Sequence, residues 1–312
     1  MLTHPALEPL MSILSLLHRT RYRYANPVEF GEHRMMMRPR DSHDLRLIDT
    51  GLTISPAAKV RWMHDVFGNS VAMARFCAPG RELLVESRIK FEHYPLPMLQ
   101  VTLEEFARTY PFSYDAEQVP DLGRTSERHY PDPDHRIDAW ARRFVEADNA
   151  HDTMAILVAM TEAIKAEFTY NPRDEMGTQD PLVTLETASG TCRDYALFMM
   201  EAARSLGFAA RFVSGYLYDQ SLTQGGANTV VGSGATHAWV QIYLPGAGWL
   251  EFDPTNALVG GQNLIRVAVT RDPKQAIPLS GSFTGKTSDF LGMEVQVEIT
   301  VETSDPQGDV QK

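Results

Sequence analysis

Cys192 is the residue whose surroundings best suit a nucleophile. It follows a turn of small residues at 188–190, and apolar side chains then recur at spacings of three and four, which predicts a helix. Gly207 supplies a C-terminal stop. A cysteine in the first turn of a helix meets unpaired backbone N–H groups and the positive end of the helix dipole. Because both favour the nucleophilic thiolate, the sequence predicts covalent chemistry at Cys192.

A thiolate nucleophile needs a base, and the base needs a group that orients it. Residues 236–244 alternate in side-chain character as a strand does, and they carry His237 near their start. Turn residues at 245–248 lead to a second strand at 249–253, which a proline ends. This pattern predicts a β-hairpin with His237 and Asp253 near the same end.

The register of this hairpin decides whether the two side chains can meet. Directly opposed residues share a face of a sheet. His237 and Asp253 share a face if either Leu244 or Ile242 lies opposite Gly248. A slip of one residue would turn Asp253 to the other face and separate the pair.

Three short motifs surround these residues. G-T-C-R-D-Y-A stands at 190–196, T-H-A-W-V at 236–240 and F-D-P-T-N at 252–256. Together and in this order they resemble the motifs of the bacterial transglutaminase-like family of papain-type cysteine enzymes. Tyr195 supplies the aromatic residue usual after Cys-Arg-Asp, whereas Leu197 stands where that family usually has a histidine.

The resemblance implies a role for each residue of the set. Cys192 is expected to be the nucleophile, His237 the general base and acid, and Asp253 the group that holds the imidazole. The resemblance also implies a papain-like core, in which the nucleophile helix packs on an antiparallel sheet. The expected fold class is α+β.

Residues 13–95 contain short strand-like runs separated by turn signals. Strands at this regular spacing predict an antiparallel sandwich or sheet. L-H-R-T-R-Y-R-Y at 17–24, R-P-R at 38–40 and D-V-F-G-N at 65–69 resemble the N-terminal β domain that accompanies the bacterial family. The resemblance therefore covers most of the chain, from about residue 14 to 290.

These patterns divide the chain into four parts. We expect an N-terminal β domain at 12–95, a linker rich in proline and polar residues at 96–134, and a catalytic domain at 135–290. Residues 291–302 alternate cleanly and are expected to form a strand that returns to the N-terminal sheet. The last ten or so residues have the composition of a disordered tail.

Three further segments of the catalytic domain have recognisable patterns. Apolar recurrence predicts helices at 136–147 and 153–168, the second capped by the segment His151-Asp152-Thr153. Residues 221–235 are rich in Gly, Ser, Thr, Asn and Gln and lead directly to His237. This segment is either a loop that covers the site or a plain exposed hairpin loop.

Composition limits the class of protein. The chain has 312 residues, of which 43% are hydrophobic, so it is long enough for two domains with buried cores. A net charge of −11 argues against non-specific binding to nucleic acid or to an anionic membrane surface. No apolar stretch reaches the roughly 18–20 residues of a membrane span. The oligomeric state cannot be predicted from these features.

Cysteine usage and the start of the chain bear on the compartment. Cys77 and Cys192, the two cysteines, are expected in different domains, so a disulfide is not expected. We expect Cys77 to be a small buried apolar residue. The first 17 residues lack the basic region of a signal peptide, and Met11 is an alternative start to Met1. Cytoplasm is the expected compartment.

Other residues near the motifs have two readings each. Asp194 either caps the helix locally or takes part in catalysis, and Trp239 either shields the His237–Asp253 bond or fills the core. An oxyanion hole needs N–H or O–H donors aimed at the developing charge. The backbone N–H of Cys192 is the natural first donor, and the side chain of Tyr170 is the candidate for the second.

The expected reaction is acyl transfer at an amide carbonyl, with a thioester intermediate and a peptide or protein amide as substrate. Hydrolysis is favoured over transamidation because no feature of the sequence marks a site for an acceptor amine. No cofactor or metal is expected, since the chain lacks a zinc-ligand pattern, a phosphate-binding loop and an EF-hand pattern. The alternative is a non-catalytic protein-interaction module on the same fold, which equal alkylation rates of the two cysteines would favour.

Overall fold

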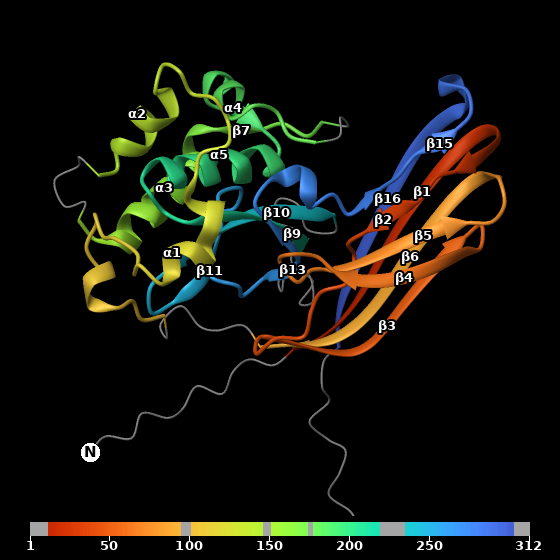
Figure 1. Ribbon diagram of the computed structural model, residues 1–312, viewed down its shortest axis with the longest axis horizontal. Helices are drawn as coiled ribbons and strands as arrows, with labels where there is room; N and C mark the ends of the chain where they lie inside the picture. Colours follow the sequence, from red (N-terminus) through yellow and green to blue (C-terminus); the bar gives the residue numbers. More distant parts are fainter. Residues whose placement is uncertain (1–11, 95–100, 146–150, 174–176, 219–234, 303–312) are drawn as a thin grey trace, which may run out of the picture.

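The computed structural model describes most of the chain (Figure 1), namely residues 12–94, 101–145, 151–173, 177–218 and 235–302. The alternative start at Met11, nearly all of the 221–235 segment and the last ten residues lie outside the described residues. Among the described helices, none combines the length and the apolar character needed to cross a lipid bilayer.

A long antiparallel sheet forms one half of a β-sandwich. Its strands are β15 (Phe283–Thr284), β1 (Ser12–Phe30), β6 (Gly80–His93) and β3 (Leu45–Ser55) in spatial order, with β16 (Phe290–Glu302) also paired to β1. Although Asn26-Pro27 favours a turn, β1 stays extended through it. The sheet accommodates the proline by a register shift between Arg23 and Val28.

The second sheet of the sandwich has the order β14 (Leu279–Ser280), β2 (His33–Met35), β5 (Ser70–Phe76) and β4 (Ala58–His64). The inner faces of the two sheets enclose a core of buried side chains that includes Tyr24, Val28, Met35, Ala74 and Val85. The antiparallel sandwich predicted from the spacing of the strands is confirmed.

The expectation that Cys77 is buried is wrong. Strand β5 ends at Phe76, and Cys77 lies in the bend that leads to β6, where its side chain is exposed. A residue beyond the end of a strand no longer alternates between the two faces of the sheet, so the strand pattern does not carry its side chain into the core.

The C-terminal part of the chain returns to the sandwich in three strands. Strands β14 and β15 pair with β2 and β1, and β16 pairs with β1 from Ile13–Glu302 to Tyr24–Phe290. Our sequence-based division assigned residues up to 290 to the catalytic domain, whereas the chain already contributes to the sandwich from Leu279 onward. The two ends of the chain thus build one sheet together (Figure 1).

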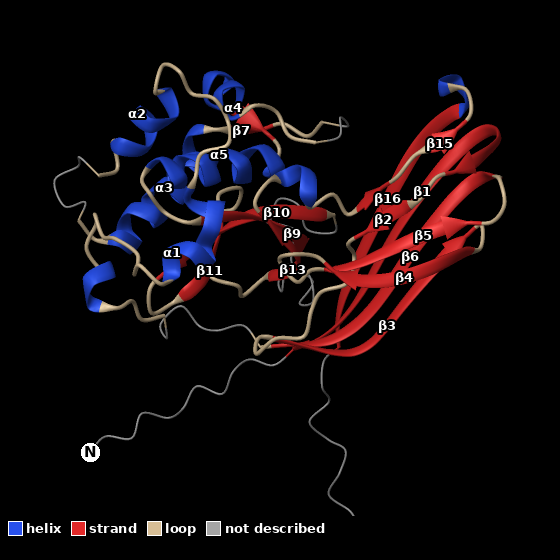
Figure 2. Cartoon of the chain, viewed as in Figure 1, coloured by secondary structure: helices blue, strands red, loops and turns tan. Residues whose placement is uncertain are grey.

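The part of the chain expected to be the catalytic core contains a further antiparallel sheet. This sheet has the order β12 (Leu258–Val259), β11 (Gly248–Asp253), β10 (Thr236–Leu244), β9 (Ala210–Leu217) and β13 (Leu264–Thr270). Helix α5 (Cys192–Ser205) packs against the aliphatic residues of β10 in a large buried cluster. Figure 2 shows the labelled α-helices gathered beside this sheet, whereas a short helical turn lies at the far end of the sandwich. The expected packing of the nucleophile helix on an antiparallel sheet is confirmed.

The other α-helices of the described residues are α1 (Gln118–Leu122), α2 (Arg136–Arg142), α3 (Thr153–Glu167) and α4 (Pro181–Thr187), with short 3-10 turns at Glu105–Ala107, Gly123–Ser126, Pro273–Gln275 and Thr287–Asp289. Helices α2, α3 and α4 pack on α5. Helix α3 begins where it was predicted, because the Asp152 side chain accepts a hydrogen bond of 2.7 Å from the Ala155 N–H. Helix α2 ends at Arg142, earlier than the predicted residue 147.

Described residues of the proline-rich segment lie on the catalytic core. Leu103 is buried in the same cluster as α5, and Ala107 is fully buried. The Tyr110 hydroxyl donates a hydrogen bond of 2.9 Å to the Leu206 carbonyl, and the Tyr114 hydroxyl donates one of 2.9 Å to the Tyr243 carbonyl. This segment therefore stabilises the core as well as connecting it to the sandwich.

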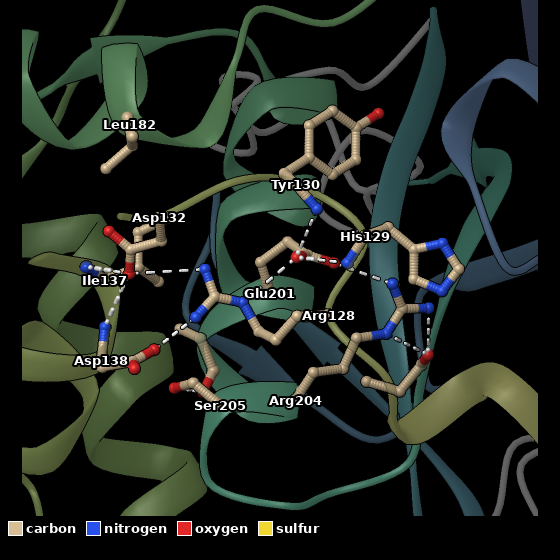
Figure 3. A network of polar contacts seen from close by, with 12 residues as sticks. Arg128, His129, Tyr130, Asp132, Ile137, Asp138, Leu182, Glu201, Arg204 and Ser205 are labelled. Carbon is tan, nitrogen blue, oxygen red and sulfur yellow. Dashed lines mark hydrogen bonds and ion pairs between the residues drawn. The ribbon is translucent and has the colours of Figure 1, made fainter. Parts of the chain in front are cut away.

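A buried polar network holds the C-terminal half of α5 in place (Figure 3). Glu201 has a fully buried side chain whose carboxylate accepts hydrogen bonds from the backbone N–H of His129 and the guanidinium groups of Arg128 and Arg204. Arg204 in turn donates to the carbonyl of Ala210 on β9. The Glu201 carboxylate thereby joins the helix, the sheet and the proline-rich segment. Its buried charge is paired with two guanidinium groups.

The sandwich and the core share a buried apolar interface. On the sandwich side it includes Leu14, Leu16, Ile89, Phe91 and Val297, and on the core side Tyr216, Tyr218, Ile265 and Val267. The long sheet therefore has two neighbours on one face, because part of that face packs on the second sheet of the sandwich and part on the catalytic core.

Candidate active site

Local hydrogen bonds fix the start of helix α5 and hence the position of Cys192. The Asp194 carboxylate accepts hydrogen bonds of 2.8 Å from both the N–H and the hydroxyl of Thr191. The Asp194 N–H donates to the Thr191 carbonyl at 3.0 Å. This reciprocal arrangement satisfies orphan groups of the first helical turn.

Asp194 also ties a second segment to this turn. Arg173 donates to it through two nitrogens at 2.6 and 3.2 Å, and the Gln179 N–H donates at 2.8 Å. Asp194 is fully buried and does not border the cavity at Cys192. These contacts favour the capping reading of Asp194 over the catalytic one, since its oxygens are occupied by structural donors.

The hairpin register brings His237 and Asp253 onto one face. Leu244 lies opposite Gly248, which is one of the two pairings that place them together. The His237 Nε2 and the Asp253 Oδ2 are 2.8 Å apart, and both side chains are fully buried. The register prediction is therefore confirmed at the level of the hairpin.

Asp253 is held by groups of its own. The Thr255 N–H donates to its Oδ1 at 2.9 Å, and the Asn256 side-chain amide donates to its Oδ2 at 2.9 Å. Burial alone would raise the pKa of Asp253, but the charge and hydrogen bonds of His237, together with Asn256 and Thr255, lower it. The Asp253 carboxyl group is therefore ionised.

The second ring nitrogen of His237 remains for Cys192. Nδ1 is buried and has no hydrogen bond of ordinary geometry within the described residues. Burial lowers the pKa of His237, but the Asp253 carboxylate and then the Cys192 side chain more than offset this and raise it to about 10. Hydrogen bonds between catalytic groups are often long before substrate binds. Nδ1 is therefore the ring nitrogen that can exchange a proton with the Cys192 sulfur.

Cys192 and His237 border one cavity of about 340 Å³. Cys192 is 7% exposed, so the cavity provides its contact with solvent and with any ligand. Side chains from the core form one part of the wall, and side chains of β1 and β16 form another. The structure thus brings together the three residues selected from the sequence, with two of them on the wall of a cavity.

A fully buried tryptophan lies beside the histidine. The rings of His237 and Trp239 are nearly parallel, with centroids 5.9 Å apart, and the Trp239 N–H donates to Glu251. Gly215 lies opposite His237 across β9 and β10. A Cβ at Gly215 would stand 2.6 Å from the Trp239 ring and 2.1 Å from the Ile265 carbonyl oxygen, so the strand needs glycine there.

Tyr170 lies next to the cysteine turn. Strand β7 (Thr169–Tyr170) runs parallel to β8 (Ser189–Gly190), and the Asn171 N–H donates to the Gly190 carbonyl at 2.9 Å. Tyr170 borders the cavity, and burial, followed by the nearby Cys192, raises the pKa of its phenol to about 12. The hydroxyl therefore keeps its proton at neutral pH and can donate a hydrogen bond, as an oxyanion-hole group must.

Sequence reasoning gave no role to two residues that position the site. Asn256 follows Asp253 by three residues inside the F-D-P-T-N motif, so the motif itself held the signal. Arg173 stands 21 positions before Asp194, and no local pattern joins the two. A long-range ion pair becomes visible only once the fold has brought its partners together.

Comparison with known proteins agrees with the fold. An uncharacterized protein of Mycobacterium leprae is 26% identical over 292 residues, which cover 92% of this chain and 98% of that protein. A protein-glutamine gamma-glutamyltransferase of Pseudomonas aeruginosa is 40% identical over 70 residues, or 22% of this chain and 10% of that protein. The fold is also similar to the crystal structure of a proposed cysteine protease from Cytophaga hutchinsonii, with a TM-score of 0.67 and 17% sequence identity. The superposed residues cover 97% of this chain and 94% of that protein's chain.

Two family models match the chain in order. Residues 14–92 match the bacterial transglutaminase-like N-terminal region. Residues 138–254 match the transglutaminase-like superfamily, and this range contains Cys192, His237 and Asp253. The first match lies in the β-sandwich and the second in the core, so the chain carries the bacterial transglutaminase-like N-terminal region ahead of a core that belongs to the transglutaminase-like superfamily.

Proposed function

We propose that this protein is a cysteine-dependent enzyme that transfers acyl groups from amide bonds, with Cys192, His237 and Asp253 as its triad. The observation that carries the proposal is the 2.8 Å contact between His237 and Asp253, made by a histidine that shares a cavity with a cysteine at the start of a helix. Family membership supports a cysteine enzyme, and the residues supply the specific roles.

The proposed reaction follows from the two nitrogens of the imidazole. The Cys192 sulfur attacks the amide carbonyl carbon, and the C–N bond breaks as the His237 imidazolium gives its proton to the departing amine. A thioester remains on Cys192. Water then attacks the thioester, loses a proton to His237 and displaces the thiolate, which completes hydrolysis. The carboxylate of Asp253 stabilises the imidazolium and holds the ring in place.

Stabilisation of the oxyanion is assigned to two donors. The backbone N–H of Cys192 lies in the first turn of α5, where helical partners are absent. The Tyr170 hydroxyl borders the same cavity and interacts with Cys192. Removing one such donor typically lowers kcat by about 10² to 10³.

Hydrolysis of a peptide or isopeptide amide is the favoured outcome. Transamidation is the second candidate, since an amine can replace water at the thioester. The short match to a protein-glutamine gamma-glutamyltransferase supports testing transamidation beside hydrolysis. Both outcomes use the same triad and the same thioester.

The test is a mass-spectrometric screen of blocked peptides that contain Gln and an isopeptide bond, with and without a labelled primary amine. We expect cleavage or deamidation by the native chain, addition of the amine if transamidation operates, and loss of all products with Cys192→Ala. Cys77→Ser is the matched control, because the Cys77 side chain is exposed on the sandwich, and it should retain full activity. Activity that survives Cys192→Ala would refute the proposal.

A further inference from the structure

The wall of the active-site cavity opposite the core comes from the two ends of the chain. Thr20 and Tyr22 of β1 and Met293 and Val295 of β16 border the same cavity as Cys192. Tyr22 is paired with Met293 and Thr20 with Val295 in the antiparallel register, so the four side chains lie on one face of the long sheet. This face is the one that packs on the core and on the second sheet elsewhere.

Packing on this face stops at the cavity. Val297, two residues further along β16, is 6% exposed and buried in the interface with the core. Val295 and Met293, on the same face of the same strand, are each 44% exposed. Two neighbouring apolar side chains thus remain uncovered beside a nucleophilic cysteine, and such concave apolar surface is typical of a ligand site.

Two polar side chains that border the cavity on the same strand, those of His18 and Thr20, are engaged in hydrogen bonds. His18 contacts the Tyr216 hydroxyl at 2.7 Å through Nδ1 and the Thr20 hydroxyl at 3.2 Å through Nε2. Burial lowers the pKa of His18 to about 4, so the ring is neutral near pH 7. Among the described residues that border the cavity there is also no carboxylate to pair with a basic side chain.

We infer that Tyr22, Met293 and Val295 form an apolar specificity subsite, which receives an apolar side chain of the peptide substrate beside the amide that Cys192 attacks. The inference rests on the proposed function and adds the class of substrate: a peptide with an aliphatic or aromatic residue flanking the reacting amide. The β-sandwich thereby contributes directly to substrate selection, and the subsite is complete only because β16 returns to pair with β1.

The test measures binding first, so that it does not depend on turnover. Fluorescein-labelled, blocked octapeptides carry a central Gln flanked on both sides by Leu, Lys or Glu, and their affinities are measured on the Cys192→Ala background. We expect the Leu peptide to bind at least tenfold more tightly than the Lys and Glu peptides. Val295→Glu should abolish this preference and favour the Lys peptide, while Val295→Ala should weaken Leu binding by about fivefold, in proportion to the apolar surface lost. Val295→Ile should retain the preference.

Gln296→Glu is the matched control, because it adds the same charge one residue away on the opposite face, next to Arg19. It should leave the affinities of the three peptides unchanged. Equal effects of Val295→Glu and Gln296→Glu, no binding, or no preference for Leu in the parent would overturn the subsite. Failure of the proposed function would give a different result. If the peptides bind with the expected preference but the chain with Cys192 intact never converts them, the subsite is supported and the proposed enzymatic activity is refuted.

Discussion

At the scale of single residues, the proposed chemistry depends on an imidazole that contacts the Asp253 carboxylate and shares a cavity with the Cys192 thiol. The Asp253 carboxylate contacts Nε2 of His237 and accepts hydrogen bonds from the Thr255 N–H and the Asn256 side-chain amide. A histidine whose pKa is raised to about 10 keeps its proton across the neutral range. The imidazolium is therefore available to stabilise a thiolate and to protonate a departing amine.

Asp253→Asn tests this electrostatic role through pH. The pKa of His237 is raised, so the imidazolium is lost only as pH rises through about 10 in the native chain. Without the carboxylate, burial dominates, and we expect the alkaline limb of kcat/KM to move toward neutral pH and the rate at pH 8 to fall by about 10² to 10⁴. A pH–rate profile measures both effects. An unmoved alkaline limb would contradict the assignment.

The same pair makes a prediction about stability. A raised histidine pKa contributes stability fully below the unfolded value of about 6.5, and this stability is lost as pH rises through the folded value of about 10. The unfolding free energy of the native chain should therefore exceed that of His237→Gln by more at pH 6 than at pH 10.5. Urea unfolding at the two pH values measures the difference, and a gap that grows at high pH would exclude the ion pair.

The two cysteines give a direct comparison of reactivity. Cys77 is exposed, whereas Cys192 is buried at the cavity. On access alone, iodoacetamide would modify Cys77 first. We expect Cys192 to react at least tenfold faster at pH 7, because it lies at the start of a helix and shares its cavity with His237, the base proposed to activate it. Peptide mapping by mass spectrometry reads both sites in one sample, and equal or reversed rates would favour a binding module without catalysis.

At the scale of elements, local sequence patterns predicted the hairpin and the helix that position the candidate site. Alternation in 236–244 and the turn at 245–248 predicted the hairpin, and parity limited the registers in which His237 meets Asp253. The small residues before Cys192 and the apolar recurrence after it predicted helix α5. These features are local, so neighbouring residues are sufficient to specify them.

Non-local contacts account for what the sequence did not predict. Nothing near Glu201 indicates that it binds Arg128 and the backbone of His129 and Tyr130, because those residues lie more than 70 positions away. Cys77 was misplaced because the end of a strand depends on pairing with its neighbour rather than on composition. Pairing and burial of this kind emerge only from the complete fold.

Asp194 allows a test of how one cap controls the nucleophile. Asp194→Ala removes the partner of Arg173 and Thr191 in a buried setting, and we expect a loss of about 3–5 kcal/mol in unfolding free energy. The first turn of α5 should also loosen and slow alkylation of Cys192. Asp180→Ala is the matched control, since the exposed Asp180 side chain caps helix α4 through the Leu182 N–H. It should cost only about 1 kcal/mol and leave alkylation unchanged.

At the scale of the whole molecule, the sandwich and the core act as one structural unit. The long sheet packs its Leu14 and Leu16 end on the core and its Tyr24 and Val28 end on the second sheet. Between these two cores, the same face borders the cavity of Cys192. The geometry of the cavity therefore depends on how firmly the sandwich is docked.

Two valine substitutions separate docking from general stability. Val267→Ala removes methyl groups from the interface between sandwich and core, and Val28→Ala removes the same groups from the interior of the sandwich. Both side chains are at least 95% buried, so each substitution should cost roughly 1–3 kcal/mol in unfolding free energy. Only Val267→Ala loosens the wall opposite Cys192, and we expect it alone to raise KM for peptides, by at least threefold with little change in kcat. Calorimetry and steady-state kinetics on the two variants measure both quantities. Equal effects on KM would show that the sandwich stabilises the chain without shaping its active site.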